Sequence, residues 1–464
     1  MAPSFGTSGL RGLVVELTPD LVARYVRAFL AVCPHGGQLF VGQDLRPSSP
    51  RIAADVIAAA QGCGIDVVDC GALPTPALAM AAMAQGAAAV MVTGSHIPAD
   101  RNGLKFYVPS GEVSKTDEAK ILEAYAAAAT REGQGGGLKM GGGVPAQYVA
   151  RYAQAFGDRA LAGLKVGVYE HSSVAREAMV AVLRSLGAQV VRLARSDVFI
   201  PVDTEAVDPE TRQMLQGWCA EHGLDALVST DGDADRPMVT DAGGQIVPGD
   251  VLGVITARLL GAQAVCTPVS SNAMVSRIPA FRQVVLTRIG SPYVIAAMEE
   301  ILAADPAAKV VGFEANGGFL LGFTAEVAGR LAPLLTRDSI LPIVAPLVAA
   351  VRAGTGLAEV VAQLPPCFTA ADRVQDINPD KARRFLAGLI EDETQRQAFF
   401  APSGAIDSLD LTDGLRVNLA SGEVVHLRPS GNAPEFRIYA QAASAAAAGD
   451  LVQAYFTRVA AAVL

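Results

Sequence analysis

Charged residues are scarce in this chain of 464 residues: Asp, Glu, Lys and Arg together make up 18% of it, against 51% for apolar residues. A disordered protein has the opposite composition, because a chain with few apolar side chains cannot bury enough surface to fold. Basic residues are also in deficit, and the formal net charge is −9. Since no run of Lys and Arg offsets this charge, the composition argues against nucleic acid as the main partner. A globular chain of this length is expected to form roughly three to four domains.

Cysteine is sparse as well, with six residues and no C-x-x-C pair. Zinc sites and disulfide frameworks use paired cysteines, so we expect these cysteines to be reduced core residues of a cytoplasmic protein. The opening residues, 1–6, have neither the basic nor the apolar segment of a signal peptide. A P-loop of the form G-x-x-x-x-G-K-[ST] is also missing, which excludes that class of kinase.

Uninterrupted apolar runs of membrane-spanning length are missing too. The stretch 72–92 carries no charge, but Pro74, Pro76 and Gly86 interrupt it, and alanine supplies most of its apolar content. A helix followed by a buried strand explains this pattern better than a membrane span. We therefore expect no membrane partner.

What the chain does contain is a unit that recurs three times: a short apolar strand, a loop, a helix, a glycine and a second strand. The copies cover residues 39–68, 164–191 and, more faintly, 264–286. This alternation of strands and helices predicts an α/β protein with three similar domains. The loops that follow the first strands would lie where such sheets bind ligands.

Glycine and proline mark the expected domain boundaries. Residues 133–143 contain seven glycines and are the clearest linker, and further breaks are expected near Pro248 and Pro365. We expect four domains, covering residues 1–140, 141–249, 250–365 and 366–464.

After Pro366 the pattern changes to a small α+β unit. A helix is expected near 379–389, strands near 415–420 and 435–440, and an Ala-rich helix at the end of the chain.

A serine on a glycine turn follows the apolar run 87–92, which is typical of a buried strand. The turn reads Thr-Gly-Ser-His, and its glycine lets the chain lift the Ser95 hydroxyl clear of the strand. His96 is adjacent, and Lys105 follows after an Asn-Gly turn. An ordinary polar turn between a strand and a helix is the alternative interpretation.

Three carboxylates alternate in a second loop, at Asp231, Asp233 and Asp235, after the apolar strand 224–228. Carboxylates this close repel one another unless a cation neutralises them, and oxygen ligands favour a hard ion, Mg²⁺ or Ca²⁺. A calcium EF-hand is excluded, because it needs Gly and Glu where Arg236 and Ala242 stand. Arg236 suits a phosphate next to the metal. A solvated acidic turn is the alternative.

Three further loops carry residue types that suit anions or sugars. Arg11 lies in a Gly-rich segment whose backbone N–H groups can approach an anion, and Glu314 and Asn316 are side chains of the kind that hold sugar hydroxyls. A plain turn is the alternative for each of these loops. The last loop combines donors around a glycine as an anion cradle: Arg428, Ser430, Gly431, Asn432 and, beyond it, Arg437.

Taken together, these loops resemble those of the α-D-phosphohexomutase superfamily, specifically its phosphomannomutase/phosphoglucomutase group. The resemblance covers the whole chain, and its most specific parts are the Thr-Gly-Ser-His-Ile-Pro run at 93–98 and the loop 231–236. It implies a heart-shaped molecule with a central cleft, built from three α/β domains with mixed sheets and a fourth that resembles the TATA-binding-protein fold. It also implies interconversion of hexose 6-phosphate and hexose 1-phosphate, with a hexose 1,6-bisphosphate as intermediate and activator.

The resemblance also implies residue roles. Ser95 would carry the phosphoryl group and, through it, would join Asp231, Asp233 and Asp235 in binding Mg²⁺. The remaining roles are transfer by His96, Lys105, Arg11 and Arg236, ring binding by Glu314 and Asn316, and binding of the other phosphate by Arg428, Ser430, Gly431, Asn432 and Arg437. The implied partner is a small phosphosugar, and the implied protein is a monomer or weak homodimer.

Four positions depart from the family's pattern, which leaves the preferred hexose open. Ile97 stands where the family usually has Asn, Asn316 replaces Ser, and Gly318 and Ser291 stand where His is common. Phosphoglucosamine mutase, which shares the serine and metal loops, is the alternative within the family, although its Glu-x-Ser-Gly-His sugar loop is missing here. A phosphatase and a non-catalytic phosphosugar-binding protein are alternatives outside it.

Overall fold

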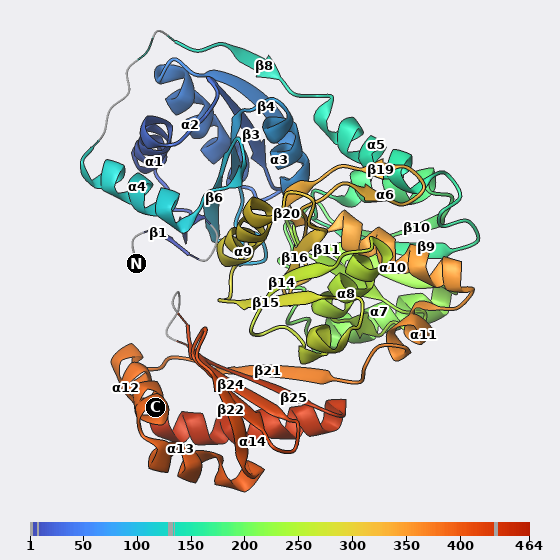
Figure 1. Cartoon of the computed structure of the whole chain (residues 1–464). Helices are drawn as coiled ribbons and strands as arrows, with labels where there is room; N and C mark the ends of the chain where they lie inside the picture. The colour runs from blue at the N-terminus through green and yellow to red at the C-terminus, as the bar shows by residue number, and fades with distance from the viewer. Residues whose placement is uncertain (1–2, 7–8, 129–132, 134, 431–434) are drawn as a thin grey trace.

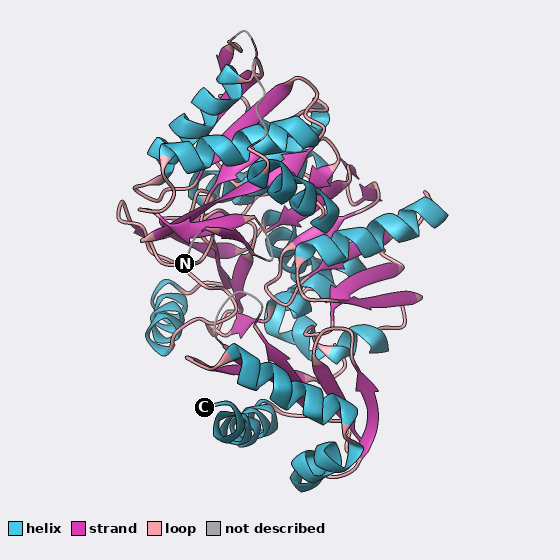
Figure 2. Ribbon diagram, turned by 90° about the vertical axis from the view of Figure 1, so that its left-hand side faces the viewer, coloured by secondary structure: helices cyan, strands magenta, loops and turns pink. Residues whose placement is uncertain are grey.

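The computed structural model of the chain describes residues 3–6, 9–128, 133, 135–430 and 435–464. Its strands form four large sheets and a two-stranded ribbon, in units that follow one another along the chain. The first three units lie together, and the fourth, red in Figure 1, lies below them in both ribbon views (Figures 1 and 2). In the part of the chain so described, no helix is long and apolar enough to cross a membrane.

The first unit is a mixed eight-stranded sheet with helices on both faces. Its strands are β1 (Ser4–Phe5), β2 (Leu10–Leu13), β3 (Gln38–Gln43), β4 (Asp66–Ala72), β5 (Ala88–Val92), β6 (Arg101–Val108), β7 (Gly111–Glu112) and β8 (Leu138–Met140). Its helices are α1 (Pro19–Val32), α2 (Ser49–Gly62), α3 (Thr75–Ala84) and α4 (Lys115–Ala126). Strands β3, β4 and β5 are parallel, whereas β6 is antiparallel to β5 and β2. Every residue of β5 is buried, because helices cover both faces of this central strand.

The Gly-rich segment between the first two units is more than a linker. Its residues 138–140 form β8, which pairs in parallel with β4 at the edge of the first sheet. Gly136 explains part of the composition, because a Cβ atom there would lie 1.9 Å from the Ile65 carbonyl oxygen. The glycines therefore let the returning chain pack against the preceding strand.

The second unit has a five-stranded mixed sheet in the order β10-β9-β11-β12-β13. Its strands are β9 (Lys165–His171), β10 (Gln189–Arg195), β11 (Ala226–Thr230), β12 (Pro237–Thr240) and β13 (Ile246–Val247), and its helices are α5 (Val144–Phe156), α6 (Arg176–Ser185) and α7 (Pro209–His222). Leu215 of α7 packs in an apolar cluster with Leu193 and Leu227 of the sheet, whereas α5 and α6 contribute to a larger cluster. The acidic loop follows β11 directly.

The third unit repeats this plan with the order β15-β14-β16-β17-β20. Its main strands are β14 (Ala264–Pro268), β15 (Gln283–Thr287), β16 (Val310–Phe313), β17 (Phe319–Leu321) and β20 (Leu334–Asp338), and β18 (Ala325–Glu326) pairs with β19 (Arg330–Leu331) in the ribbon. Its helices are α8 (Gly249–Leu259), α9 (Ser291–Ala304), α10 (Ile340–Ala353) and α11 (Leu357–Ala362). The helical stretch predicted between β14 and β15 is only the short 3₁₀ helix η1 (Ala273–Arg277), and Pro279 follows two residues beyond its end.

The fourth unit is an antiparallel sheet in the order β21-β25-β24-β23-β22 with helices packed against it. Its strands are β21 (Phe368–Val374), β22 (Ile406–Asp410), β23 (Leu415–Leu419), β24 (Val424–Pro429) and β25 (Phe436–Ala442), and its helices are α12 (Pro379–Glu391), α13 (Glu393–Phe400), η2 (Ala401–Ser403) and α14 (Ala445–Val463). The expected strands near 415–420 and 435–440 are β23 and β25. The pattern did not predict β21, β22, β24 or α13.

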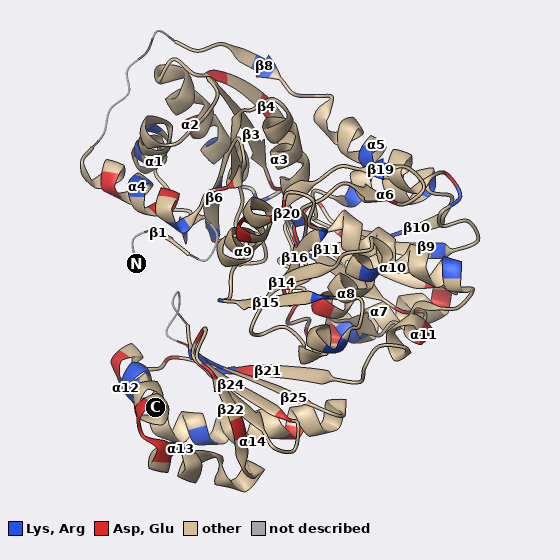
Figure 3. Ribbon diagram, in the orientation of Figure 1, with Lys and Arg blue, Asp and Glu red and all other residues tan. Residues whose placement is uncertain are grey.

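Apolar packing joins the first three units and separates the fourth. One buried cluster includes Phe40, Val168 and Phe313, from the first, second and third units, whereas the fourth unit has a cluster of its own. The fourth unit contacts the third through polar groups. For example, Gln441 Nε2 donates to the Ser271 carbonyl oxygen at 3.0 Å. Lys and Arg (blue) and Asp and Glu (red) are interspersed over all four units (Figure 3).

Candidate active site

Ser95 lies in the loop between β5 and β6, with only 1% of it exposed. Its φ of 56° is in the left-handed region, which costs energy for a residue with a side chain. Its N–H donates to Thr93 Oγ1 at 2.8 Å, and its hydroxyl donates to Asp231 Oδ2 at 2.5 Å. The His96 Nδ1 atom is 3.3 Å from the same hydroxyl oxygen. The loop therefore holds one hydroxyl in a fixed position that faces the acidic loop of the second unit.

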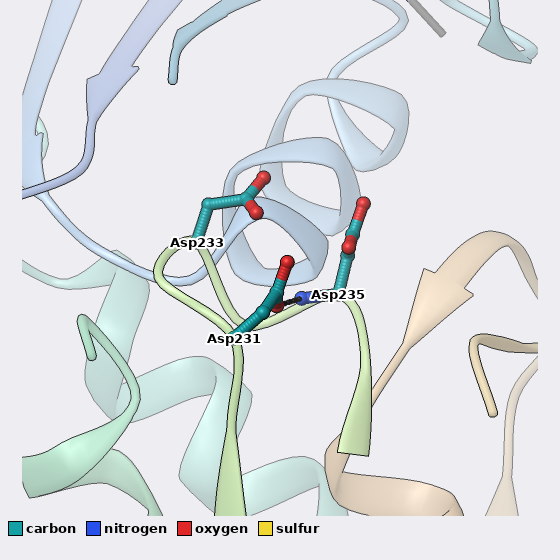
Figure 4. A group of neighbouring side chains, drawn as sticks. All are labelled: Asp231, Asp233 and Asp235. Atoms are coloured by element: carbon teal, nitrogen blue, oxygen red, sulfur yellow. Dashed lines mark hydrogen bonds between the residues drawn. The ribbon is translucent and has the colours of Figure 1, made fainter. Parts of the chain in front are cut away.

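Asp231, Asp233 and Asp235 are buried in the loop between β11 and β12. Each can offer one oxygen to a common point, because three such atoms lie within 4.8 Å of one another. Figure 4 shows the three carboxylates projecting from the same side of the loop. Asp231 Oδ1 accepts the N–H groups of Asp235 and Arg236, both at 3.2 Å, and Ala234 makes the turn with a φ of 63°.

This donor set fits a hard divalent cation. The Oδ1 atoms of Asp233 and Asp235 are buried and have no hydrogen-bond partner among the described residues. Buried carboxylate oxygens without partners are costly, and converging carboxylates are the usual ligands of Mg²⁺ or Ca²⁺. The three aspartates could therefore hold a metal ion.

Two cations from other units enter the same cluster. Lys105 Nζ, on β6, lies 2.6 Å from Asp233 Oδ2 and 2.5 Å from Asp235 Oδ2. Arg337 Nη2, on β20, lies 2.9 Å from Asp235 Oδ2. Burial alone would raise the pKa of Asp235, but Arg337 and Lys105 hold that pKa below its usual range. Burial and the neighbouring carboxylates raise the pKa of Asp231 well above its usual value.

Arg11 and His96 belong to the same cluster of charges. Burial, together with Arg236 and Arg337, lowers the pKa of Arg11 to about 10, so its guanidinium remains charged at neutral pH. Burial, together with Arg236 and Arg11, lowers the pKa of His96 far below its usual value. The His96 imidazole is therefore neutral, and one of its two ring nitrogens can accept a hydrogen bond.

Glu314 and Asn316 lie in the loop between β16 and β17 and are both buried. Glu314 Oε2 is 3.6 Å from Arg337 Nη1 and has no hydrogen-bond partner among the described residues. Asn316 Oδ1 accepts the Gly318 N–H at 3.0 Å, so its Nδ2 group is what it can offer a ligand. A Cβ atom on Gly318 would lie 2.9 Å from Arg337 Cδ. The glycine therefore makes room for Arg337, which explains why this position carries no larger side chain.

Glu205 is a carboxylate that the sequence did not single out. It lies in the segment between β10 and α7, with 46% of its side chain exposed, and its Oε2 is 3.9 Å from Arg236 Nη1. Glu205 therefore lies next to Arg236, beside the acidic loop of its own unit.

The predicted phosphate cradle lies on the fourth unit, away from Ser95 in the fold. Arg428 and Arg437 are opposite each other on β24 and β25, and Arg428 Nε donates to Asp413 Oδ1 at 2.8 Å. The Ser430 N–H donates to the Glu435 carbonyl oxygen at 2.8 Å. Two predicted members of the cradle, Gly431 and Asn432, lie outside the described residues.

The structure thus brings the residues predicted for the transfer step together and adds Arg337 and Glu205 to them. Arg337 contacts carboxylates from three units, with its Nε atom 3.6 Å from Glu112 Oε1 in the first unit. It lies within β20, a mostly buried strand, whereas Ser95 and Asp231 follow their strands. No local motif marks Arg337 in the sequence, because its partners belong to distant segments of the chain.

Comparison with known proteins identifies the family. Residues 2–132, 146–244 and 248–368 match the phosphoglucomutase/phosphomannomutase alpha/beta/alpha domains I, II and III. The chain is 44% identical to a phosphomannomutase of Sinorhizobium fredii, over 97% of this chain and 98% of that protein. The chain belongs to the phosphoglucomutase/phosphomannomutase family. This confirms the predicted superfamily, and the chain is a phosphohexomutase.

Other relatives agree with this assignment. A phosphomannomutase of Salmonella muenchen is 41% identical over 98% of this chain and 95% of its own length. A crystal structure of a putative phosphomannomutase from Thermus thermophilus superposes with a TM-score of 0.76 at 22% identity, covering 99% of each chain. The predicted fold, three α/β domains with mixed sheets followed by a sheet-and-helix domain, is confirmed.

Proposed function

We propose that this phosphohexomutase interconverts the 6- and 1-phosphates of mannose and glucose, using a phosphoryl group carried on Ser95 and a hexose 1,6-bisphosphate intermediate. The observation that carries the proposal is the position of the Ser95 hydroxyl, 2.5 Å from Asp231 Oδ2 in a buried cluster of carboxylates and cations. A phosphoryl group on that oxygen would lie among charges that can stabilise its transfer.

Phosphoryl transfer here needs positive charge and a proton acceptor more than covalent help from the protein. Asp231, Asp233 and Asp235 would hold Mg²⁺, which supplies positive charge next to the phosphoryl group when bound. Lys105 adds charge from β6, and Arg11 and Arg236 add charge on the sides of the cluster.

The chemical step is a displacement at phosphorus. The bond between Ser95 Oγ and phosphorus breaks as a sugar hydroxyl oxygen forms a bond to the same phosphorus. The hydroxyl proton passes to a base, and Ser95 Oγ takes up a proton as it leaves, so that it ends as a free hydroxyl. His96 Nδ1, 3.3 Å from Ser95 Oγ, is placed to orient the Ser95 oxygen through a hydrogen bond. In the return step the bisphosphate, turned end for end, gives its other phosphoryl group to Ser95.

Ring recognition is assigned to Glu314 and Asn316. The two side chains come from one short loop, so they can hold neighbouring hydroxyls, which we assign to O3 and O4. Mannose and glucose share these hydroxyls and differ only at C2. A site that reads O3 and O4 alone cannot strongly reject either epimer, because strong rejection needs a buried polar group left unpaired.

The phosphate that is not transferred is assigned to the fourth unit. Arg428, Ser430 and Arg437, with Gly431 and Asn432 between them in sequence, combine donors suited to an anion. Because polar contacts attach this unit to the third, it can rotate to close over the sugar and exclude water. Closure would protect phosphorylated Ser95 from hydrolysis.

Several finer features are part of the same proposal. We assign the chain to the cytoplasm, as a monomer or weak homodimer whose partner is a small phosphosugar rather than nucleic acid or a membrane. We keep the domain boundaries at 140/141, 249/250 and 365/366. Phosphoglucosamine mutase remains the second candidate, because one relative of that name, from Methanothermobacter thermautotrophicus, is 29% identical over 94% of this chain.

A side-by-side assay tests the proposed substrate. Mannose 1-phosphate, glucose 1-phosphate and glucosamine 1-phosphate are compared with a hexose 1,6-bisphosphate present. We expect conversion of the first two, with kcat/KM values within about tenfold of each other. The two sugars differ only in configuration at C2, and a site that does not contact the C2 hydroxyl discriminates weakly between them. Conversion of glucosamine 1-phosphate alone would replace the proposal with the second candidate.

A further inference from the structure

Arg46 is a buried arginine that lies between β3 and α2 and takes no part in the mechanism above. Its side chain has no exposed surface, and its guanidinium pairs with Asp44. All five N–H groups of this guanidinium have an acceptor. Nε donates to Asp44 Oδ2 at 3.0 Å, Nη1 to the carbonyls of Pro98 and Arg101 at 2.7 and 3.1 Å, and Nη2 to the carbonyls of Ser95 and Ile97 at 2.8 and 2.6 Å.

Four of these acceptors are backbone carbonyls of a single loop, the one that carries Ser95. A loop normally directs its carbonyl groups to water, because a buried carbonyl without a partner is costly. Here the segment 95–101 curls around one guanidinium, which satisfies several carbonyls at once. The position of Ser95 is therefore set by a side chain that lies about fifty residues earlier in the chain.

Asp44 closes a ring of hydrogen bonds around the same loop. Its Oδ2 atom accepts the Thr93 hydroxyl at 2.8 Å, and its Oδ1 atom accepts the Ser49 hydroxyl at 2.5 Å. Thr93 Oγ1 in turn accepts the Ser95 N–H at 2.8 Å. Ser95 is thus held at its N–H through Thr93 and Asp44, and at its carbonyl by Arg46.

The guanidinium also contacts the second unit, at Phe199 in the segment between β10 and α7. Its Cζ atom lies 4.1 Å from the centre of the Phe199 ring, a cation–π contact. A Cβ atom on Gly94 would lie 2.7 Å from Arg46 Cζ, and one on Gly232 would lie 2.9 Å from the Ser95 carbonyl oxygen. Gly94 thus makes room for Arg46, and Gly232, between Asp231 and Asp233, lets the acidic loop approach Ser95 and Phe199.

No other side chain can make this set of contacts. Lysine has three donors on a single atom, whereas the arginine fork directs five donors along fixed directions. An apolar side chain would fill the space but would remove the donor that the loop carbonyls share and leave the buried Asp44 carboxylate without its countercharge. The left-handed Ser95, at a φ of 56°, needs such support to persist.

We propose that Arg46 is a positioning residue for phosphoryl transfer: by binding the carbonyls of the Ser95 loop, it fixes the backbone of Ser95 and directs Oγ at the acidic loop. This rests on the proposed role of Ser95. Arg46 touches neither substrate nor the transferred group, so it acts on the transfer rate and not on the binding of the sugar.

The test is the variant Arg46→Lys, which keeps the charge and removes the fork. We expect kcat to fall about 100-fold, because a displacement of about 1 Å at a reacting atom has an effect of this size. KM should stay within about threefold of wild type, because the ring and distal-phosphate sites do not contact Arg46. The rate of phosphoryl loss from phosphorylated Ser95 to hexose phosphate, measured in a single turnover, should fall with kcat.

A second variant and a control keep the test decisive. Thr93→Val removes the hydroxyl between Asp44 and the Ser95 N–H without removing a charge, and we expect a fall in kcat of about tenfold at unchanged KM, the size of one lost hydrogen bond. The control is Arg51→Lys. Arg51 is on α2 and also donates to a backbone carbonyl, that of Leu17 at 2.9 Å, but does not contact the Ser95 loop. We expect wild-type kinetics from it.

Two outcomes would overturn the inference. One is a wild-type kcat in an Arg46→Lys protein that thermal unfolding shows to be folded. If Arg46→Lys does not fold, a wild-type kcat in Thr93→Val would overturn the inference in the same way. The other is a rise in KM that matches the fall in kcat/KM, which would assign Arg46 to substrate binding. A wild-type enzyme without mutase activity would instead refute the proposed function.

Discussion

At the scale of single residues, the site is a set of buried charges from different units that balance one another. Lys105 of the first unit pairs with Asp233 and Asp235 of the second, and Arg337 of the third pairs with Asp235 and Glu314. A buried charge left without its partner is strongly destabilising, whereas a complete set is tolerated. The same charges that would stabilise a transferred phosphoryl group therefore also hold the first three units together.

Glu314→Ala tests ring recognition at this scale. The substitution removes a charged acceptor for sugar hydroxyls, and such a hydrogen bond contributes about 1.5–3 kcal/mol. We expect kcat/KM to fall roughly tenfold to a hundredfold, and similarly for mannose and glucose phosphates, in steady-state assays of both. Glu326→Ala, on β18 with 69% of the side chain exposed, is the matched control. A fall in kcat/KM for only one of the two sugars would mean that the site distinguishes the configuration at C2.

Residues of the site differ in how far the sequence alone could predict them. Ser95 and the three aspartates lie in short local motifs, so their roles can be predicted from the sequence without knowledge of the fold. Arg46 and Arg337 act through partners that are distant in sequence, and nothing local distinguishes them from surface arginines. Glu205 is likewise an ordinary loop carboxylate until folding brings it next to Arg236.

At the scale of elements, polar residues at strand and helix ends carry the site and its supports. Asp250 is one such support, at the start of α8. It is 3% exposed, its Oδ2 accepts the Asn272 N–H at 2.8 Å, and its Oδ1 has no hydrogen-bond partner among the described residues. Burial raises the pKa of Asp250 from 3.8 to about 6.

The raised pKa of Asp250 predicts a pH dependence of stability. Between about pH 4 and pH 6 the folded protein keeps this proton and the unfolded chain has released it, so the free energy of unfolding falls as the pH rises through that window. The loss is at most about 3 kcal/mol. Asp250→Asn does not titrate, so its melting temperature relative to wild type should rise from about pH 4.5 to about pH 7.5 in scanning calorimetry.

A control isolates this effect. Asp450→Asn replaces an exposed carboxylate on α14, and its melting temperature relative to wild type should stay constant over the same range. A constant difference for Asp250→Asn as well would show that this buried carboxylate does not titrate in the expected window.

Elements were predictable from the sequence where hydrophobic patterns were long. The buried strand β5, the helix α6 and the closing helix α14 follow from their patterns. Strand β8 was not predictable, because it has three exposed residues in a Gly-rich segment and exists only by pairing with β4. Strand β22 was missed for a similar reason, since none of its residues is buried.

At the scale of the whole molecule, three units form one packed body and the fourth is attached through polar contacts. Gln441 is central to that attachment. Its Nε2 donates to the Ser271 carbonyl oxygen at 3.0 Å, and its Oε1 accepts the Ala273 N–H at 2.9 Å. Units joined by polar contacts are expected to move relative to each other more readily than units that share an apolar core.

Gln441→Ala tests whether this attachment sets the position of the fourth unit. Losing two hydrogen bonds of about 1 kcal/mol each should loosen the unit, so KM for the phosphosugar should rise about threefold to tenfold. Limited proteolysis near residues 364–368 should become faster. Gln453→Ala removes a hydrogen bond to Asp372 within the fourth unit and should leave both readouts unchanged. An unchanged KM in Gln441→Ala would mean that these hydrogen bonds do not set the position of the fourth unit.

The central claim is that Ser95 carries the phosphoryl group, and peptide mass mapping tests it most directly. The protein is incubated with a hexose 1,6-bisphosphate, digested and mapped, and a second sample is first chased with excess hexose 6-phosphate. We predict one phosphoryl group on the peptide that contains Ser95, lost in the chase, and none on the Ser95→Ala protein, which should fold but not turn over. Phosphate on another residue, or full activity of Ser95→Ala, would contradict the account.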